Sequence, residues 1–362
     1  MKNKKQNILI FTCANIGDFV WATSAILLIK QTNKNCNLAL ITFDRYSSLI
    51  DKKLGIDDIF ILKHKYYNSK NIFIKYIYKF TYHFFHYFKI KKYQTIIFLD
   101  QNKVWTLFVK YFYRIENIVG PNTDYCGFNI YNSSSKYFTQ TITMPMDSDR
   151  VHMMMRYQII IRIFLGTYNL SIPILPDTSN LKNKISMFID STKKYNIAIC
   201  ADGTVELRNW KIQYWEKLII QLIQLEQNIN FLITGFGDKQ YKKALYLKNK
   251  IPNANIKNCV NKTTLLELKE LLKYVNLLIS VDTGTAHIAG TNFTPTITLH
   301  GMTLPEQSMP INHNSKQICL YKKCAPCNHK ILYFNNICKN NICLEDITPN
   351  LVFDTIKQLL GI

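Results

Sequence analysis

The stretch Leu277-Leu-Ile-Ser-Val-Asp-Thr-Gly-Thr-Ala-His287 decides the fold class of this protein. A mostly apolar strand runs directly into Asp282 and a Thr-Gly-Thr turn, and we expect a helix to begin near Thr285. Free backbone N–H groups and the helix dipole make such a turn an anion site, and Gly284 lets a ligand approach the backbone closely. A diphosphate would fit this turn. The alternative is that Asp282 or Thr283 only caps the helix.

The same alternation of short apolar runs and longer amphipathic runs extends along the chain, which predicts an α/β fold with parallel sheets. In the first half, strands are expected at residues 7–13, 38–42, 59–62 and 95–99, and helices at 18–31 and 151–165. In the second half, strands are expected at 197–200, 231–234, 277–281 and 296–299, and helices at 213–225, 265–273, 285–291 and 349–360.

The length of 362 residues suits about two domains, and the 48% of hydrophobic residues excludes a disordered chain. Gly166 ends a predicted helix, and the Pro-, Asn- and Ser-rich stretch 171–184 reads as a linker. We therefore predict two Rossmann-like domains, residues 1–170 and 171–362, facing one cleft. Ligands of such sheets bind at the carboxyl ends of the strands.

Two further turns carry candidate functional residues. Ile16-Gly17-Asp18 follows the first strand, so the Asp18 carboxylate could act as a general base or only cap the next helix. Arg208, one of only six arginines, precedes Trp210, and a guanidinium beside a helix N-terminus suits phosphate. The alternative for Arg208 is a surface loop residue. Gly235-Phe-Gly237-Asp238 is compatible with nucleotide binding but is weak evidence alone.

Five of the ten cysteines lie in the last 44 residues. Cys324-Ala-Pro-Cys327 has the spacing of a thiolate metal site, and Cys338 and Cys343 would complete four ligands. Four thiolates leave no open position, so an iron or zinc ion there would be structural. The alternative is a set of reduced, partly buried thiols.

The charge of the chain is strongly positive, with 45 Lys and Arg against 24 Asp and Glu, a net charge of +21. Such an excess suggests nucleic acid, anionic membranes or phosphate-bearing ligands. However, 39 of the 45 are Lys, spread through a chain rich in Asn, Ile, Tyr and Phe. Part of the charge is therefore compositional background.

The stretch 66–93 combines aromatic residues with Lys. Three interpretations stay open: a membrane-surface segment, a base-stacking segment, or a core-packing helix with solvated Lys. Lys75, Lys79 and Lys89 interrupt it, so it is not a membrane-spanning helix. No cleavage site follows the first apolar run, which predicts a cytoplasmic protein whose cysteines need not form disulfides.

Taken in order, these segments resemble glycosyltransferase family 9, the ADP-heptose:lipopolysaccharide heptosyltransferases. Residues 7–28 are similar to its opening strand, Gly-Asp turn and helix, with Ser24 in place of the usual Pro. Residues 201–218 are similar to a segment with a basic residue before Trp. Residues 280–303 resemble its most characteristic stretch, with Thr285 where the family often has Pro or a larger residue. Residues 324–349 resemble the Cys-Pro-Cys tail of some members.

The resemblance implies a GT-B fold, with the acceptor bound by the first domain and the nucleotide-sugar by the second, and inverting transfer without a catalytic metal. It assigns Asp18 as the general base toward the acceptor hydroxyl and Arg208 to the donor diphosphate, in place of a family Lys. The remaining residues that it assigns to the donor are Asp282, Thr283, Gly284, Thr285 and His287 near the diphosphate and sugar, Asp238 near the ribose and Thr263 near the adenine.

We therefore expect a heptosyltransferase that uses ADP-heptose and a lipopolysaccharide or lipooligosaccharide core acceptor at the cytoplasmic face of the membrane. An alternative keeps the fold and donor but transfers to a protein hydroxyl. Some relatives of that type carry Cys-ligated iron, which makes the four cysteines between Cys324 and Cys343 relevant. A nucleic-acid-binding protein is a third hypothesis, but no standard nucleic-acid motif supports it, so nucleic acid is not an expected partner.

Overall fold

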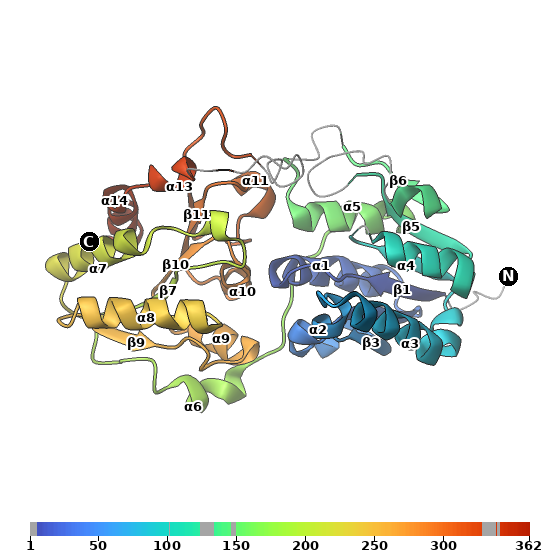
Figure 1. Ribbon diagram of the computed structural model, residues 1–362, viewed down its shortest axis with the longest axis horizontal. Helices are drawn as coiled ribbons and strands as arrows, with labels where there is room; N and C mark the ends of the chain where they lie inside the picture. Colours follow the sequence, from blue (N-terminus) through green and yellow to red (C-terminus); the bar gives the residue numbers. More distant parts are fainter. Residues whose placement is uncertain (1–5, 101, 124–133, 146–149, 328–337, 339–340) are drawn as a thin grey trace. The chain divides into compact units, whose positions relative to one another are not determined.

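The computed structural model describes residues 6–100, 102–123, 134–145, 150–327, 338 and 341–362. The chain divides into two compact units, Met1–Pro176 and Asp177–Ile362, shown in blue to green and in yellow-green to red (Figure 1). The division falls within the stretch 171–184 whose composition indicates a linker. The end of that stretch forms a 3-10 turn, Ser179–Leu181, and the short helix α6 (Lys182–Ile185).

The first unit is built on a six-stranded sheet in the order β3-β2-β1-β4-β5-β6, in which all neighbouring strands are parallel. The strands are β1 (Asn7–Phe11), β2 (Asn37–Phe43), β3 (Asp58–Leu62), β4 (Thr95–Phe98), β5 (Asn117–Pro121) and β6 (Gln140–Ile142). This is the Rossmann strand order, and its topological switch point lies between β1 and β4.

Helices of the first unit pack around this sheet. They are α1 (Ile16–Thr32), α2 (His64–Tyr67), α3 (Ile72–Lys91), α4 (Lys103–Leu107) and α5 (Met153–Leu165), with 3-10 or π turns at Asp44–Leu49, Lys52–Leu54, Phe108–Tyr113 and Ser134–Tyr137. Helix α1 is apolar nearly all round because it lies between the sheet and α5. The buried Gln158 amide of α5 donates to Ser24 Oγ of α1 at 3.1 Å and to the Ser171 carbonyl at 2.8 Å, so it also holds the start of the linker.

The second unit repeats the architecture, with a parallel sheet in the order β12-β11-β10-β7-β8-β9. The strands are β7 (Tyr195–Cys200), β8 (Ile229–Ile233), β9 (Asn255–Asn258), β10 (Leu277–Val281), β11 (Thr296–His300) and β12 (Ser315–Cys319). Read from the β9 edge, this is again the Rossmann order, with the switch point between β7 and β10.

The helices of the second unit enclose a core centred on two tryptophans. They are α7 (Ile212–Leu225), α8 (Asp238–Lys250), α9 (Leu265–Leu272), α10 (Gly284–Thr291), α11 (Pro305–Ser308), α13 (Ile342–Glu345) and α14 (Pro349–Leu360), with a 3-10 turn at Glu206–Arg208. Trp210 and Trp215 pack edge to face at 4.9 Å. Trp210 Nε1 also donates to the Ile347 carbonyl at 2.8 Å, which fixes the chain before α14.

Every strand and helix listed from the sequence pattern is present, with ends shifted by a few residues. Strands β5, β6, β9 and β12 and helices α2, α4, α6, α8, α11 and α13 were not predicted, and a helix in the stretch 66–93 was only one of three interpretations. The strands at sheet edges lack long apolar runs because they are only half buried, as in β9 and β12. Helix α8 buries only Ala244 and Leu247. Among the described helices, none has the length and apolar character to cross a bilayer.

Candidate active site

The switch point of the second sheet gathers a buried ionic cluster. Arg208 Nη1 lies 3.3 Å from Asp282 Oδ2, and the same nitrogen donates to the Asp282 carbonyl at 3.4 Å. His287 Nε2 lies 3.6 Å from Asp282 Oδ1. Asp282 follows β10, Arg208 lies in the loop after β7, and His287 lies on α10. The fold therefore brings together three side chains that are far apart in the sequence: Arg208 and His287 are separated by 79 positions.

The charges of this cluster determine the state of its carboxyl group. Burial alone would raise the pKa of Asp282, but the Arg208 guanidinium, the hydrogen bond of His287 and the nearby His300 hold the pKa well below its usual range. Asp282 is therefore ionised. It anchors Arg208, whose side chain keeps about a fifth of its surface exposed (22%), at the carboxyl edge of the sheet.

The turn after Asp282 opens α10 and places the Gly284 and Thr285 amides at the helix start, whereas the Ala286 amide donates to the Thr283 carbonyl at 3.1 Å. Thr283 is the N-cap residue, but its side chain makes no capping hydrogen bond, so the capping alternative is wrong for Thr283. Instead, the Thr283 and Thr285 hydroxyls lie 3.7 and 3.5 Å from Cys200 Sγ. A Cβ on Gly203 would come within 3.2 Å of Thr283 Cγ2, so this position favours glycine where the two loops meet.

The other two predicted donor residues lie on neighbouring loops. Asp238 is the exposed first residue of α8, and Thr263 is half-buried before α9. The Gly237 amide donates to Asn261 Oδ1 at 2.7 Å, which joins these two loops. Lys239 Nζ lies 2.6 Å from Glu206 Oε1, which links the start of α8 to the turn that carries Arg208. The structure thus brings Asp238 and Thr263 to the same edge of the sheet, on loops next to the ionic cluster.

Two features of this edge were not assigned from the sequence. His300, at the end of β11, is buried with its ring nitrogens 3.1 Å from Thr298 Oγ1 and 3.3 Å from Thr303 Oγ1, and burial lowers its pKa to about 4. Asp202, after β7, forms a 2.6 Å ion pair with Lys243 of α8. Both lie at the carboxyl end of a buried strand, His300 as the last residue of β11 and Asp202 two residues after β7, and this position was the signal that could have found them.

The switch point of the first sheet holds two carboxyl groups. Asp18 lies in the first turn of α1, and its Oδ2 accepts a hydrogen bond from the Asn15 amide at 3.0 Å. Asn15 is therefore the N-cap of α1, and Asp18 is the third helical residue of a capping box rather than the N-cap itself; its role as a base is a matter for experiment. Asp100, which follows β4, accepts from the Tyr157 hydroxyl at 2.6 Å and from Thr12 Oγ1 at 3.2 Å.

Asp100, which directly follows the strand expected at residues 95–99, received no role from the sequence. Burial raises its pKa to about 7, and the negative charge of Asp18 adds to the rise, against the hydrogen bonds from Tyr157 and Thr12. Ionising one member of this pair disfavours ionising the other. At neutral pH the Asp18–Asp100 pair is therefore poised to hold a proton on Asp100.

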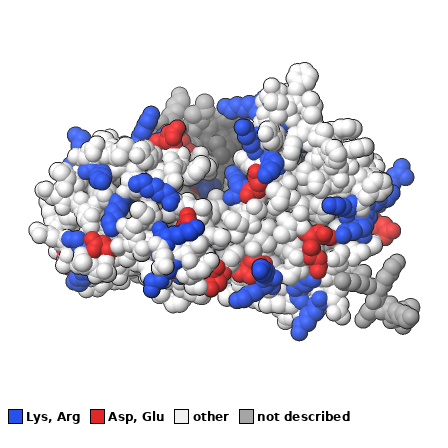
Figure 2. All heavy atoms as spheres, turned by 90° about the horizontal axis from the view of Figure 1, so that it is seen from below, with Lys and Arg blue, Asp and Glu red and all other residues white. Residues whose placement is uncertain are grey.

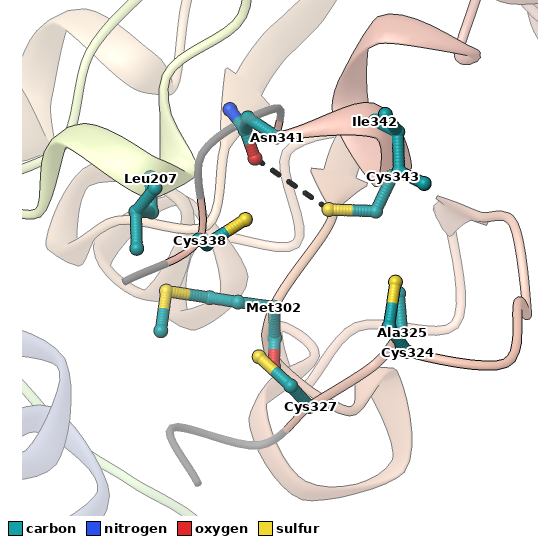
Figure 3. A pocket seen from close by; sticks show the side chains of 9 residues that line it. All are labelled: Leu207, Met302, Cys324, Ala325, Cys327, Cys338, Asn341, Ile342 and Cys343. Atoms are coloured by element: carbon teal, nitrogen blue, oxygen red, sulfur yellow. Dashed lines mark hydrogen bonds between the residues drawn. The ribbon is translucent and has the colours of Figure 1, made fainter. Parts of the chain in front are cut away.

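The four predicted metal ligands line one small pocket of the second unit (Figure 3). Cys324 and Cys327 come from the loop after β12, Cys343 from α13, and Cys338 from a single described position between them. Cys343 Sγ lies 3.5 Å from Asn341 Oδ1. However, no three His, Cys, Asp or Glu side chains in the described ranges converge closely enough to hold a metal ion. The cysteines share a pocket, but their arrangement does not fit a four-thiolate site.

The sequence of this chain matches a known protein family. The family model for glycosyltransferase family 9 (heptosyltransferase) matches residues 131–337, more than half of the chain. Lipooligosaccharide heptosyltransferase 2 of Campylobacter jejuni is 29% identical over 155 residues, which make up 42% of this chain and 47% of that protein. The chain thus spans about half the length of the curated relative it matches.

Two solved structures show the same fold. The ADP-heptose LPS heptosyltransferase II of E. coli superposes with a TM-score of 0.72 at 16% identity, covering 98% of both chains. The iron-containing dodecameric glycosyltransferase TibC of enterotoxigenic E. coli has a TM-score of 0.59 at 13% identity, covering 100% of this chain and 78% of that one.

Two parallel Rossmann-like sheets, each with polar residues gathered at its switch point, define an α/β protein of the GT-B class. The predicted fold class is confirmed. Within that class, the chain belongs to glycosyltransferase family 9.

Proposed function

We propose that this protein transfers heptose from ADP-heptose to a lipopolysaccharide or lipooligosaccharide core acceptor, with inversion at the anomeric carbon. The first unit would bind the acceptor and the second the donor. The observation that carries the proposal is the Arg208–Asp282–His287 cluster at the switch point of the second sheet, in a chain of this family. The named relatives act in lipooligosaccharide and LPS synthesis, which supports the choice of acceptor.

The second unit has the chemistry that a departing nucleoside diphosphate needs. The bond between the anomeric carbon and the diphosphate oxygen breaks, and negative charge grows on the leaving group. In this proposal, the Arg208 guanidinium and the amides at the start of α10 stabilise that charge. The hydroxyls of Thr283 and Thr285 lie at the same turn. Asp238 and Thr263 would meet the ribose and the adenine.

The first unit supplies the base in this proposal. The acceptor hydroxyl oxygen attacks the anomeric carbon, forming the new glycosidic bond, while its proton passes to the Asp18 carboxylate. Because the pKa of Asp100 is about 7, a large fraction of Asp100 is protonated near neutral pH, and this proton reduces the repulsion between the two carboxyl groups. Asp100 therefore acts as a positioning residue that keeps its partner in the basic form.

A donor and acceptor assay tests the proposal. Purified protein is incubated with ADP-heptose and a defined core acceptor that lacks the terminal heptose, and the product is identified by mass. The expected product is the acceptor plus one heptose, together with ADP. ADP-glucose and UDP-glucose serve as matched donors; transfer from either of them, with none from ADP-heptose, would overturn the choice of donor.

A protein hydroxyl is the second candidate acceptor. The structurally similar TibC is iron-containing, which is why the pocket shared by Cys324, Cys327, Cys338 and Cys343 bears on this candidate, although these cysteines do not converge as metal ligands would. Incubation with ADP-heptose and either a core oligosaccharide or a Ser-rich extracellular protein domain separates the two acceptors by product mass. Elemental analysis of the purified protein adds a second readout: tightly bound iron would support the protein acceptor, whereas metal-free protein would agree with cysteines that do not converge.

Nucleic acid has no part in this proposal. Figure 2 shows Lys and Arg scattered singly or in small groups over the face seen from below, with Asp and Glu among them. Nucleic-acid binding would favour a continuous basic stripe. The peripheral location at the cytoplasmic face of the membrane stays part of the proposal.

A further inference from the structure

Helix α3 carries its apolar side chains on the side that faces water. Five of them form a stripe at intervals of three or four residues, each between 62% and 85% exposed: Phe73, Ile77, Phe80, Phe84 and Phe88. We call these five residues the outer stripe. Residues spaced in this way lie on one side of a helix. A core-packing helix would bury such a stripe, so that alternative for the stretch 66–93 is wrong for this side of α3.

The opposite side of α3 holds the helix on the protein through polar and aromatic groups. His83 Nδ1 lies 2.7 Å from the Tyr113 hydroxyl, and its ring stacks on Phe108 at 3.7 Å. The Lys79 ammonium lies over the Tyr67 ring at 4.3 Å, and Lys79 is buried. Two polar side chains of α3, Lys79 and His83, thus face the protein together with Tyr82 and Ile90, while the five apolar side chains of the outer stripe face water.

The exposed apolar surface extends beyond the outer stripe. Further exposed apolar side chains lie on α3 or on the π turn that packs against it: Ile72, Ile74, Tyr76, Phe85, Tyr111 and Phe112. A contiguous apolar surface of this kind is costly in water and marks an interaction site. Its position on one helix of 20 residues indicates a flat, elongated contact.

The charges around the outer stripe select the partner. Helix α3 contains no Asp or Glu; by helical position Lys91 lies on the same side as the outer stripe, Lys89 lies farther round the helix and Lys75 lies on the opposite side. Two acidic side chains whose charges act on α3, Asp58 and Asp44, are already paired with Lys92 at 2.7 Å and with Lys63 at 3.7 Å. A second copy of the chain, docked through the same face, would bring two sets of Lys together. An anionic surface would instead complement them.

We propose that the outer stripe of α3 inserts into the interface of a membrane with anionic headgroups. The aromatic rings would lie at the boundary of headgroups and acyl chains, and the Lys side chains would reach the phosphates. The helix would lie in the plane of the membrane, because no described helix is able to span it. This surface deepens the peripheral membrane location proposed above by assigning it to α3, and it does not depend on the proposed sugar transfer.

Binding to vesicles tests the outer stripe without any measurement of activity. The full chain is mixed with vesicles of phosphatidylcholine alone or of phosphatidylcholine with phosphatidylglycerol, and the bound fraction is measured by flotation. Wild-type protein should bind the vesicles that contain phosphatidylglycerol. The triple variant Phe80→Ser, Phe84→Ser, Phe88→Ser should bind them at least about tenfold more weakly.

Two matched variants make this result specific. Tyr168→Ser with Met187→Ser changes side chains that are 89% and 71% exposed but lie outside α3, and this variant should bind like the wild type. Lys89→Gln with Lys91→Gln should lose the preference for phosphatidylglycerol. Circular dichroism verifies that each variant is folded.

Three results would overturn the proposal. The first is no binding of the wild type to either vesicle, and the second is equal binding of the triple variant and the wild type. The third is self-association of the wild type that the triple variant abolishes, because the outer stripe would then cover a second copy. A failure of the heptose assay would leave all three measurements unchanged, so the two proposals fail separately.

Discussion

Tyr157 donates a 2.6 Å hydrogen bond to Asp100 across 57 positions of sequence. The bond joins α5 to the end of β4, beside Asp18 at the switch point of the first sheet. Burial and the charge of Asp100 raise the pKa of Tyr157, so its hydroxyl remains the donor at every physiological pH. This contact places a proton-holding carboxyl group next to the proposed base.

Asp100 should make the stability of the first unit depend on pH. Its pKa of about 7 in the folded chain lies above the ordinary value of 3.8, so the folded state binds the proton more tightly than the unfolded state does. The contribution is complete below about pH 4 and is lost as the pH rises through about 7. Relative to Asp100→Asn, the wild type should lose on the order of 3 kcal/mol between about pH 4 and about pH 8.

Chemical unfolding of both proteins across this pH range measures the difference. Asp51→Asn is the control. Like Asp100, Asp51 is a buried, hydrogen-bonded carboxyl group of the first unit; it caps a 3-10 turn and accepts from the Lys53 amide. A difference between wild type and Asp100→Asn that stays constant with pH would contradict the assigned protonation.

Asp18→Asn should lower turnover by about 10²- to 10⁴-fold, because the amide cannot accept the proton of the acceptor hydroxyl. The Asn oxygen can still accept the hydrogen bond from the Asn15 amide, so α1 should begin at the same residue. ADP binding should be unchanged, since the proposed donor residues lie in the second unit. Initial rates and ADP titration calorimetry give the two readouts. Wild-type turnover in this variant would remove Asp18 as the base.

Arg208→Gln should weaken ADP binding by about 10- to 100-fold, through loss of a charge-assisted hydrogen bond. It should also lower the melting temperature, because Asp282 would remain buried without its guanidinium partner. Arg208→Lys should recover part of the affinity. Lys239→Gln is the control, since it breaks a largely exposed ion pair with Glu206 and should change stability by less than about 1 kcal/mol. Equal affinity in Arg208→Gln and wild type would argue against a contact between Arg208 and the diphosphate.

Gln158→Leu should destabilise the first unit by about 2–4 kcal/mol. The Gln158 amide makes hydrogen bonds with the Ser171 carbonyl and amide at 2.8 and 2.9 Å, and a Leu side chain would leave both backbone groups buried without their partner. Limited proteolysis should then cut near residues 171–176 sooner than in the wild type. Gln221→Leu, at a more exposed helix position, should have little effect on that cleavage. Identical cleavage rates in Gln158→Leu and wild type would show that the hydrogen bonds do not hold the linker.

Much of the candidate site could be predicted from the sequence because its residues follow buried strands directly. Leu277–Val281 is a strand at the bounds expected, and Asp282, Thr283 and His287 follow it at the carboxyl edge. The Cys324 to Cys343 set shares a pocket, as its spacing indicated, yet it does not form the predicted metal site. Spacing along a chain restricts which thiols can meet, but loop geometry decides whether their sulfurs converge.

The sequence by itself determined the local structure: which runs become buried strands, which turns carry charged residues, and which side of α3 is apolar. These features depend on periodicities of two and 3.6 residues, which near neighbours express. Only the tertiary structure decided that the apolar outer stripe of α3 faces water. It also decided that Asp100 accepts a hydrogen bond from Tyr157 and lies close enough to Asp18 for the Asp18 charge to raise its pKa. Burial and long-range pairing depend on which elements pack together, and the packing of the sheet brings distant residues to one edge.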